Sequence, residues 1–257
     1  MAASVAGVAP DQKAARFTQV FNLFVQRAIV RWEPRAAQIL IAEGNRAARA
    51  YEQTGSEAAA LDAVLPSVWR TYLNRLVMST VPKAGELVSV LLGKATPNVF
   101  VDAAVRYLRQ NAAQKVQGIT DTSREAIGNQ IRIGVEKGES RVQIAQRISY
   151  HRRSITPGRA QTIARTEVHG AANYGSLIAA AEERLPMVKI WQAMGGARPT
   201  HAAASGQRRA LSEPFQVGSA LLDHPGAAGP AAETVNCRCS MTYEVEEARR
   251  PRRRPAA

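Results

Sequence analysis

Cysteine and aromatic residues are scarce in this sequence, and long apolar runs are absent. Only 2 of the 257 residues are Cys, and 5% are Phe, Trp or Tyr. Two cysteines exclude the framework of a disulfide-rich secreted domain and suit a reducing compartment. No apolar run approaches the roughly 20 residues that a membrane-spanning helix needs, and the N-terminus lacks the pattern of a signal peptide. We therefore expect a soluble protein, without a membrane partner, made and used inside a cell or packaged from one.

Positive charge is abundant. The formal net charge is +13, and five arginines stand near the C-terminus: Arg249, Arg250, Arg252, Arg253 and Arg254. A basic body with an arginine-rich tail is typical of proteins that bind a polyanion, most often nucleic acid. These five residues are our candidates for non-specific electrostatic contact with double-stranded DNA. A merely solubilising surface is the alternative that charge alone leaves open.

The first half of the chain predicts helices that pack on one another. An apolar stripe with helical spacing runs from Phe17 to Trp32 and is expected to be interrupted or kinked at Pro34. A second stripe, Leu61 to Val77, is expected to end before Pro82, and Pro97 is expected to open another helix. We assign residues 1–117 to a helical N-terminal region.

Helix signals continue through the middle of the chain. Thr122 and Glu125 match a capping box, and Ser140 can cap the helix that follows Gly138. Thr156 and Pro157 are then expected to start a further helix, as cap and first turn, that ends near Pro186. The boundary between the N-terminal region and a C-terminal domain is expected between residues 118 and 156.

The sequence changes character after Pro186. The segments VKIWQAM and TVNCRCSMTYEV read as strands, and about forty residues rich in Gly, Pro, Ser and Ala separate them. The expected fold class is α+β: a mostly helical N-terminal region followed by a helix and a small, loop-rich β domain. That domain spans residues 118–245, and residues 246–257 form a basic tail that is too charged and proline-broken to fold alone.

Both cysteines lie in one short segment. A disulfide between Cys237 and Cys239 would be strained, because only one residue separates them. The same spacing lets two thiolates bind one metal ion, and His201 and His224 complete the four ligands of a structural zinc site. The alternative is a pair of buried free thiols, with His201 hydrogen-bonded to backbone. Both interpretations stay open at this point.

The second half of the chain also resembles a known family. The segments RAQTIARTEVHGAANYG, KIWQAM, RPTH, FQVGSALLDHPG and NCRC occur in the order and approximate spacing of the phage Mu protein F-like head morphogenesis domain. The resemblance covers roughly residues 118–245. Its motif positions correspond to Arg165, Thr166, Glu167, Trp191, His201, Pro225, Gly226, Asn236, Cys237, Arg238 and Cys239. Two acidic positions of the family are absent, because Gly195-Gly196-Ala197 and Ala227 stand in their places.

The resemblance implies a role in virus assembly. Members of this family are minor head proteins of tailed bacteriophages and prophages, associated with the portal vertex and with head assembly or DNA delivery. It therefore implies portal and capsid proteins as partners and a location in the virion head after assembly in the cytoplasm of the host bacterium.

The sequence gives little support for catalysis. Glu167 and His169 lie two positions apart on an expected helix and so point to different faces. The sequence contains no GxSxG, phosphate-binding loop or HExxH motif. We predict that the protein is not an enzyme. The alternatives are a basic DNA-binding module that is not of phage origin and a zinc-dependent hydrolase.

Overall fold

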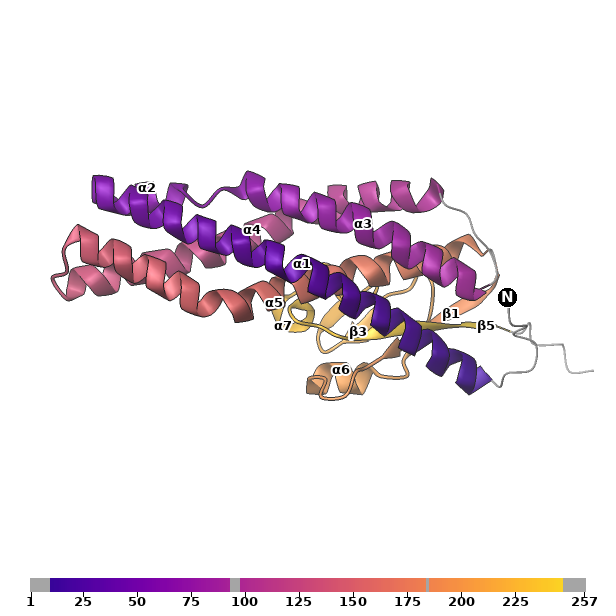
Figure 1. Cartoon of the computed structure of the whole chain (residues 1–257). Coiled ribbons are helices and arrows are strands. Elements are labelled where there is room, and N and C mark those ends of the chain that lie inside the picture. Colours follow the sequence, from indigo (N-terminus) through magenta and orange to yellow (C-terminus); the bar gives the residue numbers. More distant parts are fainter. Residues whose placement is uncertain (1–9, 93–97, 184, 247–257) are drawn as a thin grey trace, which may run out of the picture.

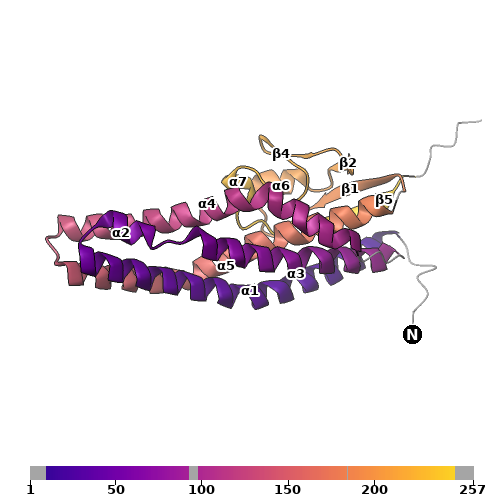
Figure 2. The ribbon, with the colours of Figure 1, turned by 90° about the horizontal axis from the view of Figure 1, so that it is seen from above.

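Long helices dominate the computed structural model, which describes residues 10–92, 98–183 and 185–246. The long helices are α1 (Pro10–Thr54), α3 (Pro66–Leu92), α4 (Asn98–Glu136) and α5 (Arg141–Glu182), and the short α2 (Glu57–Asp62) connects α1 to α3. Figures 1 and 2 show them side by side in an elongated bundle, with a small β unit against one flank. Within the described ranges, no helix combines the length and apolarity needed to cross a bilayer.

Local signals explain where most of these helices begin and end. The Ser140 side chain accepts from the Gln143 backbone N–H, and the Gln143 side chain accepts from the Ser140 backbone N–H, so a complete capping box opens α5. Gly55 and Gly138 follow α1 and α4 with φ of +66° and +69°, a conformation that favours glycine. The predicted cap at Ser140 is confirmed. The start of α4 at Asn98 adjoins the predicted start at Pro97, which lies outside the described residues.

Three prolines lie inside helices, where the sequence predicted breaks. Helix α1 is not interrupted at Pro34, α3 does not end before Pro82, and α5 does not restart at Pro157. A proline removes one backbone hydrogen bond, yet residues on both sides of it here remain in one core. Val81 and Ala84, which flank Pro82, are both fully buried in the main cluster of the bundle. Tertiary packing on both sides of the proline therefore maintains the helix.

The predicted capping box at Thr122 is also wrong, because Thr122 lies within α4. Its hydroxyl donates to the carbonyl of Gly118, 2.8 Å away and one turn earlier, instead of capping a new helix. Helix α4 also runs through the expected boundary between residues 117 and 118 without a break.

The β unit follows α5 and contains two small sheets. Strands β1 (Met187–Gln192), β2 (Arg208–Ala210) and β5 (Ser240–Val245) form an antiparallel sheet in the order β2-β1-β5, and β3 (Phe215–Val217) pairs with β4 (Ala220–Leu222). The short helices α6 (Pro199–Ala204) and α7 (Ala231–Thr234) complete it. The α+β fold class and the strand in VKIWQAM are confirmed. The second predicted strand begins only at Ser240, so both cysteines lie in the turn before it.

Tyr243 of β5 connects the β unit to the helical bundle. Its ring packs edge-on against Phe17 of α1, with centroids 6.1 Å apart, and its hydroxyl lies 2.8 Å from that of Ser176 in α5. Tyr243 also packs against both the main bundle core and the core of the β unit. The β unit is thus attached to two helices at once.

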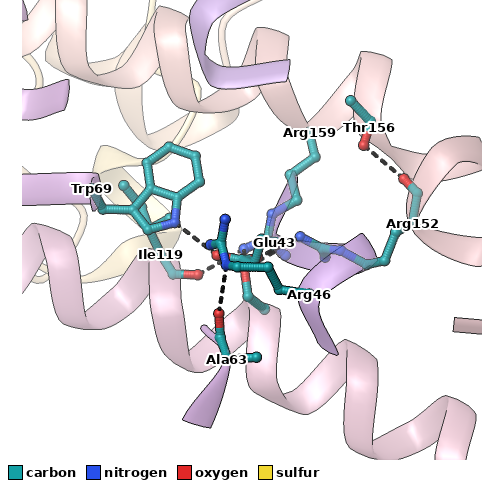
Figure 3. A network of polar contacts seen from close by, with 9 residues as sticks. Glu43, Arg46, Ala63, Trp69, Ile119, Arg152, Thr156 and Arg159 are labelled. Carbon is teal, nitrogen blue, oxygen red and sulfur yellow. Dashed lines mark hydrogen bonds and ion pairs between the residues drawn. The ribbon is translucent and has the colours of Figure 1, made fainter. Parts of the chain in front are cut away.

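A buried ionic network joins helices of the bundle (Figure 3). The carboxylate of Glu43 in α1 is fully buried and accepts from the guanidinium of Arg152 in α5 at 2.7 Å and from the indole N–H of Trp69 in α3 at 2.9 Å. Arg152 crosses α1 at Gly44, where an added Cβ would lie only 2.7 Å from the Arg152 side chain. The guanidinium of Arg159 donates to the Ile119 carbonyl of α4 at 2.7 Å.

We expect Glu43→Ala to destabilise the protein by about 3–5 kcal/mol, because it leaves the Arg152 charge buried without its partner. Urea unfolding followed by circular dichroism measures the change. Arg208→Ala is the matched control, because it breaks an ion pair with Glu244 in which both side chains are half exposed. The control should cost less than about 1 kcal/mol. Equal losses in the two variants would contradict the importance of the buried network.

Candidate metal centre

The two cysteines lie on one side of the turn between α7 and β5. Asn236 adopts a left-handed conformation with φ of 59°, which turns the chain immediately before them. Cys237 and Cys239 are buried while Arg238 between them is exposed, so the two thiols point into the β unit. Both thiols are free. The turn at Asn236 therefore explains how both thiols of the Cys-x-Cys segment come to face the same site.

Helix α6 brings the imidazole ring to the same place. His201 is 2% exposed, and its ring packs edge-on against Trp191 of β1 with centroids 5.5 Å apart. Pro199 occupies the first turn of α6, where its missing N–H costs no hydrogen bond. The family-motif residues Trp191 and His201 are therefore in direct contact.

His201, Cys237 and Cys239 form one cluster, here called the Cys–His group. Their ligand atoms all lie within 4.8 Å of one another, and the Nδ1 atom of His201 is 3.4 Å from the Cys239 sulfur and 3.6 Å from the Cys237 sulfur. Zinc bonds of about 2.3 Å to sulfur and about 2.0 Å to nitrogen, at a tetrahedral angle, place these atoms about 3.5 Å apart. The geometry of the group fits a zinc ion.

A carboxylate supports the imidazole from behind. The Nε2 atom of His201 lies 3.1 Å from a carboxylate oxygen of Glu233 in α7, and that oxygen also accepts from the Thr200 hydroxyl at 2.8 Å. Carboxylates beside the far nitrogen of a metal-binding histidine orient the ring and strengthen it as a ligand. Sequence reasoning missed Glu233, because a lone Glu in a four-residue helix carries no recognisable signal.

The two thiols share their protons unequally. A hydrogen bond from Cys237, together with His201, lowers the pKa of Cys239 against the opposing effect of burial. The same thiol–thiolate hydrogen bond, followed by burial, raises the pKa of Cys237 far above its ordinary value. Cys239 is thus the thiol that loses its proton more readily, and thiolate is the form that binds metal.

His224, the fourth ligand expected from the sequence, is not part of the Cys–His group. Its Nδ1 atom donates to the Pro225 carbonyl at 3.1 Å, and its ring packs beside the rings of Tyr107 and Tyr174, with centroids 6.5 Å and 5.8 Å away. The structure therefore brings three of the four expected ligands together. Burial is the main reason that the pKa of His224 falls to about 4.

A cavity of about 200 Å³ adjoins the Cys–His group. Its walls include Gly195, Gly196 and Arg238 as well as all three members of the group. None of the described residues that line it is Asp or Glu, so it offers no carboxylate as a general base. The arrangement suits metal binding better than acid–base chemistry.

Residues of α5 hold the cysteine turn in place. Arg165 donates to the Asn236 side chain at 2.7 Å, and the Thr166 hydroxyl accepts from the Asn236 backbone N–H at 2.8 Å. Seven residues after Thr166, on the same helix face, Asn173 donates to the Cys239 carbonyl at 3.0 Å. Asn173 lies within a segment that the family resemblance covers, yet sequence reasoning gave it no role.

The remaining family-motif residues fasten neighbouring parts of the same region. Glu167 lies 2.9 Å from the Lys115 ammonium of α4, and both side chains are largely buried. Gly226, with φ of 76°, approaches α5 so closely that a Cβ on Gly170 would lie 2.6 Å from its carbonyl oxygen. The arginines of the tail, residues 249–254, lie outside the described residues.

A pH dependence of stability follows from the buried histidines. Burial, and then the charges of Arg165 and Arg238, lower the pKa of His169 from 6.5 to about 4. The unfolded chain therefore takes up this proton near pH 6.5, whereas the folded chain does so only near pH 4. We expect the free energy of unfolding to fall as the pH drops from 6.5 to 4. The slope of the unfolding free energy against pH corresponds to the number of protons taken up on unfolding, and His169→Gln should reduce this number by about one. Urea unfolding across this pH range measures the slope, and an unchanged slope would contradict the shifted pKa.

Comparison with known proteins supports the resemblance noted from the motifs. Residues 125–242 match the family model described as phage Mu protein F like protein. No curated protein and no solved structure matches the chain. The matched range includes α5, the cysteine turn that it holds and the whole Cys–His group. Residues 125–242 of this chain are therefore similar to the phage Mu protein F like family, the family suspected from the motifs.

Proposed function

We propose that this protein is a minor head protein of a tailed bacteriophage or prophage and acts in head morphogenesis at the portal vertex. The observation that carries the proposal is the family match over residues 125–242. The geometry supports it, because residues of the family motif hold one another in a compact unit. Arg165 and Thr166, for example, both bind Asn236.

The bundle gives this unit a rigid, elongated support. Helices α1 and α5 contain 45 and 42 residues, which corresponds to roughly 60–70 Å of helix at about 1.5 Å per residue. The β unit is attached to one flank of the bundle (Figure 2), so the opposite face and the distant end stay accessible. We propose that these helical surfaces contact portal and capsid proteins.

We also propose contact with double-stranded DNA. The net charge of +13 favours a polyanion, and a location in the virion head would place the protein beside packaged genome. The arginines of the tail remain candidates for this contact.

We propose that the Cys–His group binds a structural zinc ion. The β unit has short strands and a small core, so a metal ion would add folding free energy that apolar burial supplies only in part. His201, Cys237 and Cys239 would be the protein ligands, with Glu233 as support for the imidazole. The absence of a carboxylate from the described walls of the adjoining cavity favours a structural role for the ion over a hydrolytic one.

The role in the head predicts association with purified particles. In a phage or lysogen that encodes this chain, we expect the protein to cofractionate with heads and its deletion to reduce the yield of infectious particles. Expression of the intact chain in trans should restore the yield. Normal particle yield and infectivity in the deletion strain would contradict the proposed function.

The zinc site predicts a metal content that depends on three residues. We expect about one zinc ion per chain by elemental analysis, and a large loss of bound zinc in Cys237→Ser and Cys239→Ser, because each variant removes a ligand. His224→Gln is the control and should keep its zinc. Zinc-free protein that melts at the same temperature with and without added zinc would show that the group consists of free thiols.

A further inference from the structure

A groove between α1 and α3 gathers positive charge without a balancing carboxylate. It has a volume of about 500 Å³ and lies on the helical bundle, away from the Cys–His group. Its lining residues include Arg35, Gln38 and Arg46 from α1 and Thr71 and Arg75 from α3. None of its lining residues is Asp or Glu. We refer to it as the arginine groove.

A second groove, between α2 and α4, shows that this composition is not a general property of the surface. That groove has a similar volume of about 520 Å³ and contains Arg124 and Arg132. Three glutamates line it as well, Glu57, Glu125 and Glu136, so its charges are of mixed sign. The arginine groove is different because its charges have one sign only.

The guanidinium groups of the arginine groove are partly fixed in position. Arg35 lies over the ring of Trp32, 5.0 Å from its centroid, and donates to the Arg31 carbonyl. Arg46 donates through Nε to the Ala63 carbonyl at 3.2 Å, which leaves its buried Nη2 without a partner among the described residues. Groups held in this way lose little conformational freedom when they bind an anion.

A buried carboxylate close to the groove is already hydrogen-bonded to other residues. Glu43 lies next to Arg46 in Figure 3, but its two oxygens are already occupied by Arg152 and by the indole of Trp69. No ion pair joins Arg35, Arg46 or Arg75 to a carboxylate among the described residues. All three guanidinium groups therefore lack an anionic partner.

We propose that the arginine groove binds the sugar–phosphate backbone of double-stranded DNA. Arg35 and Arg46 lie about 16 Å apart along α1 at about 1.5 Å per residue, a length over which one DNA strand presents about five phosphates. Planar guanidinium groups suit phosphate oxygens, and Gln38 and Thr71 add further hydrogen-bond donors. The inference rests on the proposed position beside the packaged genome, to which it adds a binding surface within the described residues.

The groove is less suited to an acidic protein partner. Protein interfaces depend on aromatic or apolar anchors that a partner can cover. The two aromatic residues of the groove, Trp32 and Tyr72, are only 5% and 3% exposed and already pack on each other. The groove therefore has no exposed aromatic anchor, whereas its arginines supply the hydrogen-bond donors that phosphate contacts require.

The salt dependence of DNA binding tests the proposal. Affinity of the full chain for a short labelled duplex is measured by fluorescence anisotropy across about 50–200 mM salt. We expect Arg35→Gln/Arg75→Gln to lower the slope of log K against log salt by about 1.8, because two phosphate contacts are lost. The control, Arg124→Gln/Arg132→Gln, also removes two positive charges but comes from the groove with glutamates, and its slope should change far less.

The possible results separate the two proposals. DNA binding with equal slopes in both double variants would overturn the arginine groove and leave the head protein role intact. Binding of a polyglutamate peptide through the groove, without any binding of the duplex, would assign it to an acidic protein and overturn the inference. Absence of DNA binding by the unaltered chain would overturn the proposed DNA contacts of both the arginine groove and the arginine-rich tail. Cofractionation with heads would still decide the head protein role.

Discussion

The buried carboxylate of Glu43 constrains the arrangement of the helical bundle. A charge that is fully removed from water must be compensated by partners at short distance. Those partners come from two other helices, Trp69 in α3 and Arg152 in α5. A shift of any of these helices along its axis by one turn would separate the groups and leave a charge buried alone. The network therefore fixes the axial positions of α1, α3 and α5 relative to one another.

The position of α5 in turn determines the position of the candidate metal centre. Arg165, Thr166 and Asn173 follow Arg152 on the same unbroken helix, and together they bind the turn that contains both cysteines. The carboxylate of Glu167 contacts Lys115 of α4 and so ties this stretch of α5 to its neighbour. One continuous helix thus connects the packing of the bundle to the geometry of the Cys–His group. The motif residues Arg165, Thr166 and Glu167 therefore attach α5 to the cysteine turn and to α4.

Local sequence signals correctly predicted the features that depend on neighbouring residues in the chain. The cap at Ser140 and the strand around Trp191 depend on nearby residues, and both were predictable. The breaks expected at Pro82 and Pro157 did not occur, because packing with distant parts of the chain maintains these helices. No periodicity or motif encodes that packing.

The candidate site was predictable to a similar extent. Residue types pointed to a site that contains both cysteines and His201, and the structure brings these three together. Residue types alone could not separate His201 from His224, since the loops that decide which imidazole reaches the thiols have no periodic pattern. Glu233 became recognisable only through its contact with His201.

The contact between Phe17 and Tyr243 has a consequence for biosynthesis. These residues are 226 positions apart, yet their rings meet at the first turns of α1. A ribosome therefore releases the start of α1 long before the strand that covers it exists. During translation Phe17 therefore lacks this packing partner until Tyr243 has been synthesised, and exposed apolar surface of this kind favours aggregation. Synthesis of β5 therefore supplies the last strand that joins the β unit to the bundle.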